Sequence, residues 1–599
     1  MNDALFSASP LESVYDVPLL QAAHRHADMT DALLALGFRA HDIRLVADYQ
    51  KTAAIGPSEA IQEVGAGTGE DIARAHALMT DLPYLAREVA LPLALDAVRP
   101  FAPAIGDDAQ PEFCPIAVRA TENAYNVLYA IASPTHVTAV RNFTFARTIE
   151  GKKIHAQCCL ASRLVVERLY HRGIRDTARE FDEALTLPAE AGRHRLALKA
   201  LIMHACYQGA SDIHFDPLPS AGVLRLRIDG LLTVFRVIKR DAINVDAENS
   251  IFDRLITLIA QDIKQRDAQG QAEGALDTEV PPALAGKYQF RVEIMSTVNG
   301  PGGCIRILDR TGDTAEFAQL GLDPEAAAQL LQYAQASSGM IVATGPTGSG
   351  KTTLINSLMR TIDSVSTSVQ TIENPVEVRM GTWRQHETRR LTGHEDESTE
   401  WMSWFRGMLR NDPDVVLLGE VRDADVARVA FDMANTGHLV FTTLHAKSAS
   451  LAVARLREMR SPKTGEGLDM DAAAALLLCI IAIRLVRRLC LHCRVLDDRA
   501  STRETVLRGL DATEREMPIY RAGPGCPRCG QVGFRGRVMI YEILPMASDV
   551  RAAISERAST RTIARFLPPQ KTLWASGLKR VAAGITSLDE VMRVVNEDD

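Results

Sequence analysis

The sequence predicts an α/β protein built from several domains, and three observations support this. The chain has 599 residues, which is too long for a single hydrophobic core, so about three to five domains are expected. From about residue 314, short runs rich in Val, Ile and Leu alternate with amphipathic helical segments. This alternation is typical of a parallel sheet with helices on both faces. Residues 190–312 show a helix followed by strands, which predicts a second α/β domain.

The predicted domains follow one another without an internal repeat. The first part of the chain carries mixed helical patterns, then two short helices around a Gly-rich turn, then a pair of strands that lead into a helix. The last part is helical. The domains are an N-terminal extension at 1–48, a small α/β domain at 49–180, the second α/β domain at 190–312, the parallel-sheet domain at 314–484, a cysteine-bearing subdomain at 485–545 and a helical segment at 546–599.

Individual elements can also be predicted. Within the 190–312 domain we expect helices at 194–209 and 248–263, separated and followed by strands. The longest apolar run, from Ala472 to Ile483, is about 12 residues long and predicts a buried helix, because spanning a bilayer takes roughly 20 residues. The expected strands of the parallel sheet are MIVATG, SVQTIE, DVVLLGE and HLVFTTLH. The polar stretch at 384–404 has no clear pattern.

Composition limits the classes of partner and compartment. The formal net charge is −8 and the isoelectric point is near 6.1, which argues against nucleic acid as the main partner. The N-terminal sequence MNDALFSASP has no basic region leading into an apolar stretch, so we expect no signal peptide. Of the ten cysteines, four have metal-ligand spacing and the others are scattered or adjacent. These features predict a cytoplasmic protein in a reducing compartment.

One motif predicts a phosphate-binding loop. The sequence GPTGSGKTT follows a predicted strand and opens a predicted helix, which is the context that the P-loop pattern requires. Glycines let the backbone N–H groups approach phosphate, the lysine neutralises the β- and γ-phosphates, and the first threonine coordinates Mg²⁺. We therefore predict ATP and Mg²⁺ as ligands. The motif comprises Gly345, Pro346, Thr347, Gly348, Ser349, Gly350, Lys351, Thr352 and Thr353.

Acidic and histidine side chains follow other strands of the same predicted sheet. Glu420 stands just beyond the strand of DVVLLGE, where α/β sheets bind ligands, and Gly419 takes the place of the usual Asp. Glu373 and Glu377 lie on the turn TIENPVEV, where two carboxylates could divide Mg²⁺ binding and water activation. His438 and His445 bracket the strand of HLVFTTLH. Taken alone, a histidine at a strand end is more often structural than functional.

The cysteine spacing predicts a metal site. Two CxxC pairs, Cys490 with Cys493 and Cys526 with Cys529, are separated by 32 residues and suit a tetrahedral four-thiolate zinc site. Because no open coordination position is implied, the zinc would be structural. A redox pair or unliganded cysteines are the alternatives.

Together these motifs resemble the secretion ATPase superfamily. GPTGSGKTT, TIENPVE, LRNDPDVVLLGEVRD and NTGHLVFTTLHAKSA resemble its Walker A motif, Asp box, Walker B motif and His box, in the same order. QGASDIHFDP and LRLRIDG are similar to its N-terminal ring domain. The resemblance implies a PAS-like N-terminal ring domain and a RecA-like P-loop ATPase domain with a Cys₄ zinc subdomain. The four cysteines and the long N-terminal region favour its assembly branch, which serves type IV pili and type II secretion.

The resemblance also implies roles for single residues. It makes Glu377 the general base, Glu420 the Walker B acid, and His445 together with His438 the sensors of the γ-phosphate. Arg291 and Arg306 match arginines that reach the nucleotide across a domain or subunit boundary, although each also fits an exposed strand position. Asn374 departs from the usual Asp of the Asp box, which weakens a direct metal role at that position.

At the level of the assembly, the resemblance implies a homohexameric motor at the inner face of a bacterial inner membrane. Its partners would be a polytopic platform protein and, through the N-terminal region, a cytoplasmic adaptor domain. A nucleic-acid translocase with the same core and a non-hydrolysing ATP-binding scaffold are the alternative functions. The acidic balance argues against the first of these, and the intact Lys351, Thr352 and Glu420 argue against the second.

Overall fold

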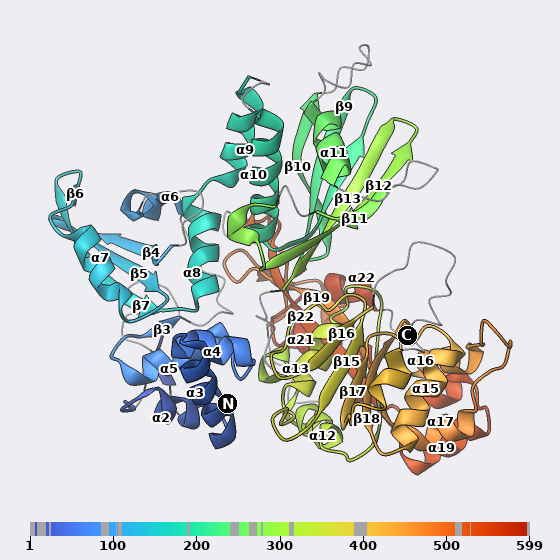
Figure 1. The fold of residues 1–599 in the computed structure, drawn as a ribbon. Helices are drawn as coiled ribbons and strands as arrows, with labels where there is room; N and C mark the ends of the chain where they lie inside the picture. The colour runs from blue at the N-terminus through green and yellow to red at the C-terminus, as the bar shows by residue number, and fades with distance from the viewer. Residues whose placement is uncertain are drawn as a thin grey trace. The chain divides into compact units, whose positions relative to one another are not determined.

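The chain folds into two compact units, Met1–Asp313 and Thr314–Asp599. They are described separately below from a computed structural model (Figure 1). The described residues are 6–8, 19–22, 25–85, 95–103, 105, 111–188, 192–239, 251–262, 272–276, 280–310, 317–388, 404–508, 518–526 and 529–595.

The first part of unit 1 is a mixed sheet with helices around it. Its strand order is β1-β2-β3-β7-β5-β4, with β6 beside β7, and β5 pairs with β7 in parallel. The expected pair of short helices around a Gly-rich turn is confirmed by α4 and α5, and the strand pair by β4 and β5. The strands are β1 (Phe6–Ala8), β2 (Leu19–Ala22), β3 (Tyr84–Leu85), β4 (Phe113–Ala120), β5 (Ala124–Ile131), β6 (Thr148–Ile149) and β7 (Lys152–Leu160). The helices are α2 (Met29–Ala35), α3 (Ala40–Ala53), α4 (Pro57–Val64), α5 (Gly69–Met79), α6 (Leu95–Val98), η2 (Arg99–Phe101), α7 (His136–Thr144), α8 (Arg163–Leu169) and η3 (Tyr170–Ile174).

The second part of unit 1 is an antiparallel sheet with the order β10-β9-β8-β13-β12-β11. Its apolar face packs against α10 and α11. Alternate strand residues such as Ile213 and Phe215 point into this core, while Asp212 and His214 lie on the other face. The strands are β8 (Ala210–Pro217), β9 (Ala221–Ile228), β10 (Leu231–Lys239), β11 (Ala272–Ala275), β12 (Tyr288–Thr297) and β13 (Gly300–Asp309). The helices are α9 (Thr177–Thr186), α10 (Arg193–Gln208), α11 (Ile251–Asp262) and η5 (Pro282–Leu284).

Unit 2 is organised around the P-loop sheet, whose strand order is β16-β15-β17-β18-β14-β19-β22. The first six strands in this order, from β16 across to β19, pair in parallel, as the alternation of strands and helices predicted. Their carboxyl ends therefore lie at one edge of the sheet. The strands are β14 (Gly339–Thr344), β15 (Val369–Glu373), β16 (Arg384–Glu387), β17 (Val415–Leu418), β18 (Leu439–Leu444), β19 (Leu477–Leu489) and β22 (Phe534–Pro545). The helices before β19 are η6 (Phe317–Leu320), α12 (Pro324–Ala334), α13 (Lys351–Met359), α15 (Ala424–Asn435), α16 (Ala449–Glu458) and α17 (Met470–Leu476).

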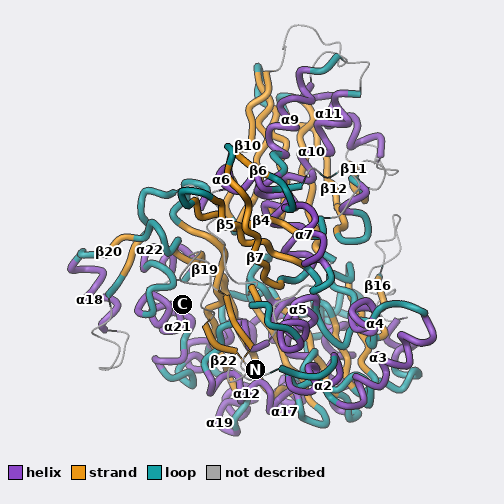
Figure 2. The backbone as a smooth tube through the Cα atoms, turned by 90° about the vertical axis from the view of Figure 1, so that its left-hand side faces the viewer, coloured by secondary structure: helices purple, strands orange, loops and turns teal. Residues whose placement is uncertain are grey.

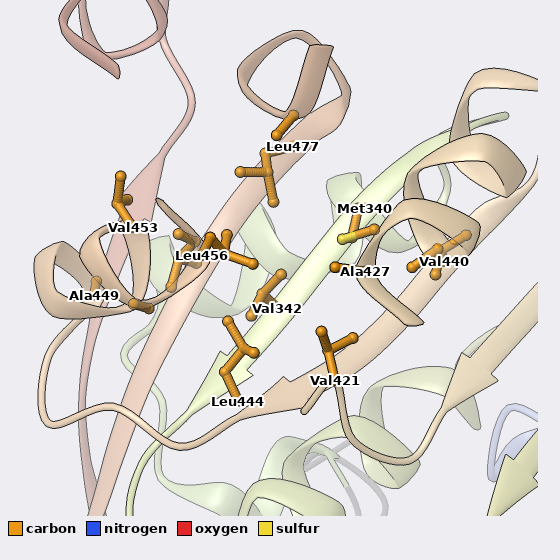
Figure 3. Packing of buried hydrophobic residues seen from close by; sticks show 14 of the residues in the cluster. Met340, Val342, Val421, Ala427, Val440, Leu444, Ala449, Val453, Leu456 and Leu477 are labelled. Carbon is orange, nitrogen blue, oxygen red and sulfur yellow. The ribbon is translucent and has the colours of Figure 1, made fainter. Parts of the chain in front are cut away.

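Both faces of the P-loop sheet are buried. Along β14, Met340 and Val342 join a core with α15, α16 and α17, whereas Ile341 and Ala343 join a second core with α12 and α13. Figure 3 shows the first of these cores, where side chains of β14, β18 and β19 meet those of α15 and α16. This double burial explains why the strands read as continuous apolar runs.

The apolar run from Ala472 to Ile483 corrects one prediction. It was expected to be a single buried helix, but α17 ends at Leu476 and β19 begins at Leu477. β19 pairs in parallel with β14 through Ala482 and antiparallel with β22 along its length. Figure 2 shows β19 and β22 side by side, with β20 and α18 beyond one end of the pair.

The segment between β19 and β22 and the C-terminal helices complete unit 2. Among the described helices, none combines the length and the apolar composition that crossing a bilayer would require. The elements are β20 (Val495–Leu496), α18 (Ala500–Arg508), β21 (Tyr520–Arg521), α19 (Ser548–Ser555), α20 (Thr560–Ala564), η9 (Pro569–Lys571), α21 (Leu573–Ala582) and α22 (Leu588–Val594).

Candidate functional site

The predicted phosphate loop connects β14 to α13, at the carboxyl edge of the P-loop sheet. Gly345, Gly348 and Gly350 have positive φ angles of 156°, 77° and 92°, which favour glycine. A Cβ atom at Gly345 would lie 2.4 Å from the Ser349 Oγ and 2.7 Å from the Ile483 carbonyl oxygen, so a side chain is sterically excluded there. The glycines therefore allow the loop to close tightly over the end of β14.

The loop fits a phosphate ligand. Gly350 caps α13 without a side-chain hydrogen bond, so the N–H groups of the first turn carry no side-chain cap. The Ser349 Oγ is buried without a hydrogen-bond partner among the described residues. Thr352 is half-buried in the first turn of α13, and the exposed Pro346, Thr347 and Gly348 form the outside of the loop. An orphaned hydroxyl and an uncapped helix start at one place are what a phosphate group would satisfy.

Lys351 is buried within this loop. Its ammonium group donates to the carbonyl oxygens of Gly345 at 2.9 Å and Pro346 at 3.1 Å. Burial lowers the pKa of Lys351, while the carboxylates of Glu420 and Glu377 act in the opposite direction. The two predicted catalytic acids therefore lie within electrostatic reach of the predicted phosphate-binding lysine.

Glu420 is held between the ends of three strands. The neighbouring Gly419 donates its N–H to the Ile372 carbonyl at 2.8 Å, and its carbonyl accepts from Thr443 Oγ1 at 2.7 Å. A Cβ at Gly419 would lie 3.2 Å from the Ile372 carbonyl oxygen, a tight contact that glycine avoids. The Glu420 carboxylate contacts His445 Nε2 at 3.3 Å and Arg422 Nε at 3.3 Å.

Glu373 and Glu377 lie at the end of β15 and in the turn that follows it. The Glu373 carboxylate is 4% exposed and accepts from Thr371 Oγ1 at 2.7 Å and Gln385 Nε2 at 3.3 Å. Burial raises the pKa of Glu373 to about 7, and the nearby carboxylate of Glu377 adds to this rise. Glu377 itself is half-buried.

The two predicted histidines lie at opposite ends of β18. His445 follows the carboxyl end, next to Glu420. His438 precedes the amino end, where its Nδ1 lies 2.9 Å from the Met433 carbonyl oxygen. Because β14 and β18 are parallel and in register, the P-loop is at the far end of β18 from His438, roughly 20 Å along the strand. The structure therefore brings His445, but not His438, to the phosphate loop of the same chain.

Two features of the site were missed by sequence reasoning. Arg484 is 6% exposed in β19, bonds the Ile483 and Lys447 carbonyls, and acts electrostatically to lower the pKa of Lys351. A charge at the end of an apolar run was its only sequence signal. The other feature is β16, in the stretch that had no clear pattern; residues 389–403 of that stretch lie outside the described residues.

Arg291 and Arg306 belong to unit 1 and are cross-strand neighbours on β12 and β13. They share the polar face of the antiparallel sheet, opposite the face that packs on α10 and α11. Arg306 Nε lies 3.2 Å from the Asp212 carboxylate.

The four predicted zinc ligands form one cluster. Their sulfur atoms all lie within 4.8 Å of one another, with Cys490–Cys526 at 3.7 Å and Cys493–Cys529 at 3.8 Å. Four sulfur atoms each about 2.3 Å from a tetrahedral zinc would be about 3.8 Å apart, so the spacing fits the metal. Burial raises the pKa of the Cys529 thiol, but N–H donation from Cys526 and Gly533 and hydrogen bonds from the thiols of Cys493 and Cys526 together outweigh it and lower the pKa to about 7.

Comparison with known proteins places these motifs in one family. The family described as type II/IV secretion system protein matches residues 190–593. The type IV pilus assembly ATPase TfpB of Acinetobacter baylyi is 33% identical over 399 residues, which are 66% of this chain and 64% of TfpB. A putative type II secretion system protein E of Escherichia coli is 32% identical over 406 residues, 67% of this chain and 76% of that protein. The solved structure of the pilus retraction motor PilT with bound ADP has 24% identity and a TM-score of 0.44, over 66% of this chain and 96% of PilT.

Proposed function

The chain belongs to the type II/IV secretion system protein family, and on that premise we propose that it hydrolyses ATP to power assembly of a type IV pilus or a type II secretion pseudopilus. One observation carries the proposal. Lys351 lies in the phosphate loop, where the start of α13 has no side-chain cap. It is within electrostatic reach of two acids, Glu377 after β15 and Glu420 after β17. Two carboxylates at this place supply what hydrolysis needs beyond phosphate binding, one oxygen donor for Mg²⁺ and one base for a water molecule.

In the proposed reaction, ATP enters with Mg²⁺ as the substrate. The loop N–H groups and Lys351 bind the β- and γ-phosphates, and the Thr352 hydroxyl and Glu420 face the metal. Glu377 accepts a proton from water as the water oxygen bonds to the γ-phosphorus. The bond from that phosphorus to the bridging oxygen breaks, so ADP and phosphate leave. His445, held by Glu420, reports whether the γ-phosphate is present.

The larger assembly is part of the same proposal. We assign residues 190–312 to a PAS-like ring domain, 314–484 to a RecA-like domain, 485–545 to a zinc subdomain and 49–180 to an adaptor-binding domain. Six copies would form a ring at the inner face of the inner membrane, where Arg291 and Arg306 reach a nucleotide across a boundary and hydrolysis moves a platform protein. Arginines that meet the γ-phosphate stabilise the charge of the transition state and couple turnover to domain motion.

Substitution of the P-loop lysine tests the activity. Lys351→Ala removes the cation on the β- and γ-phosphates and should lower steady-state phosphate release by about a hundredfold or more. Lys571→Ala is the matched control, because Lys571 pairs with Glu325 on the surface of the same unit. Near-normal turnover in Lys351→Ala would contradict the assignment. Stimulation by single-stranded DNA would instead indicate a nucleic-acid translocase.

A further inference from the structure

Strand β16 lies beside the strand that carries the acidic turn. It pairs in parallel with β15, with Gln370 opposite Arg384 and Glu373 opposite Glu387. Residues 374–383 connect the two strands, and Glu377 lies within this connection. A residue of β16 can therefore contact both the end of β15 and the turn that follows it.

The side chain of Gln385, in β16, makes three hydrogen bonds to this turn. Its Oε1 accepts from the Met380 N–H at 2.7 Å. Its Nε2 donates to the Val378 carbonyl at 2.8 Å and to the Glu373 carboxylate at 3.3 Å. Both N–H donors of the amide are used, so the side chain links the strand end to the far side of the turn.

The backbone is held on both sides of Glu377. Val376, before it, donates its N–H to the Glu387 carboxylate at 3.2 Å, and Val378, after it, accepts from Gln385. The N–H of Thr388 also donates to the Glu373 carbonyl at 3.0 Å. The turn makes these bonds with β16, so its shape depends on that strand.

We infer that Gln385 is a positioning residue, which holds the turn so that the Glu377 carboxylate stays within electrostatic reach of Lys351. This inference rests on the proposed ATPase function. A displacement of about 1 Å in a catalytic group can cost about a hundredfold in rate. Loss of the Gln385 bonds should therefore slow the chemical step, whereas the phosphate loop between β14 and α13 is built without Gln385 and should still bind ATP.

The test compares Gln385→Met with the matched control Gln370→Met in the full chain. Met keeps the length of the side chain and removes its hydrogen bonds. Gln370 is fully buried on the neighbouring strand β15, and its amide donates to the Asn411 carbonyl at 2.8 Å, at the end of the strand away from the turn. We expect Gln385→Met to lower kcat for ATP by about ten- to a hundredfold and to change KM less than about threefold.

Gln370→Met should keep kcat within about twofold even where it lowers the Tm. Gln385→Asn, which keeps the amide but shortens the side chain, serves as a second variant if Gln385→Met does not fold. Wild-type kcat in a folded Gln385 variant, or an equal fall of kcat in Gln370→Met, would overturn the inference.

A second measurement does not depend on turnover. Hydrogen exchange of the Met380 amide should be about tenfold faster in Gln385→Met than in the wild type, because this N–H loses its acceptor and the turn loses the Gln385 bonds. Unchanged protection would also overturn the inference. If the wild-type protein does not hydrolyse ATP, the proposed function fails, and hydrogen exchange still decides whether Gln385 orders the turn.

Discussion

Glu373 shows how the site uses burial to change a single carboxyl group. Its side chain lies beside other carboxylates, and burial raises its pKa from the ordinary 4.5 to about 7. The protonated form is therefore favoured in the folded protein. Its stabilising contribution is fully present below the unfolded pKa and is lost as the pH rises through 7. Above this pH the carboxyl group is ionised while buried, which lowers the free energy of unfolding of the nucleotide-free protein.

Glu373→Gln should remove this destabilisation in a pH-dependent way. The rise in pKa corresponds to roughly 3 kcal/mol, so the substitution should stabilise unit 2 by about that amount at pH 8 and by less than about 1 kcal/mol at pH 5. Thermal unfolding of the nucleotide-free protein at the two pH values measures the difference. An equal effect at both values would contradict it.

Residues fixed by local chemistry were the most predictable. The P-loop from Gly345 to Thr353 was placed correctly between a strand and a helix, because its glycines and lysine act through the nearby backbone. Residues whose role depends on contacts with distant parts of the chain were harder to predict. His438 could be separated from His445 only once the register of β14 and β18 was known. The sequence around Arg484 and Gln385 does not indicate their contacts, because Arg484 bonds the loop that follows β18 and Gln385 bonds the turn that follows β15.

At the scale of elements, the parallel strands of the P-loop sheet were predicted, as were helices and strands in residues 190–312, but the antiparallel pairing there and the strand partners were not. The run from Ala472 to Ile483 read as one helix because a short apolar run has the same appearance in a buried helix and a buried strand. It divides at Leu477 because its second half pairs with β14 and β22. β22 lies after the cysteine pairs, and nothing in its local sequence indicated that it returns to the P-loop sheet.

The cysteine cluster lies in the connection between β19 and β22, and we propose that it holds zinc. Purified protein should contain about one zinc ion per chain. Cys526→Ser should lose it and make the region 485–545 faster in hydrogen exchange, because such a site contributes on the order of 10 kcal/mol to local folding. Cys158→Ser, outside the cluster, is the control and should keep the metal. A metal-free protein with unchanged exchange in this region would contradict a structural zinc.

On the scale of the whole molecule, each unit has hydrophobic cores of its own. The core of the antiparallel sheet is made from residues 181–307, and those around the P-loop sheet from residues 317–595. Within unit 1, the buried Glu167 of α8 pairs with Lys287 at 2.6 Å, and Arg168 pairs with Asp309 at 2.9 Å. These pairs tie the small α/β domain to the antiparallel sheet, whose strands carry Arg291 and Arg306.

The proposed motor divides its work between the two units, and this division can be tested. The P-loop and both acids belong to unit 2, whereas Arg291 belongs to unit 1. Residues 314–599 expressed alone should therefore fold and bind ATP but turn it over at least about a hundredfold more slowly than the full chain. Arg291→Ala in the full chain should reproduce the slow turnover and retain ATP binding. Arg236→Ala, in the edge strand β10 and paired with Asp182, is the control and should keep normal turnover. Full activity of the isolated unit would mean that hydrolysis does not require the arginines of unit 1, and that their strands serve only to transmit motion.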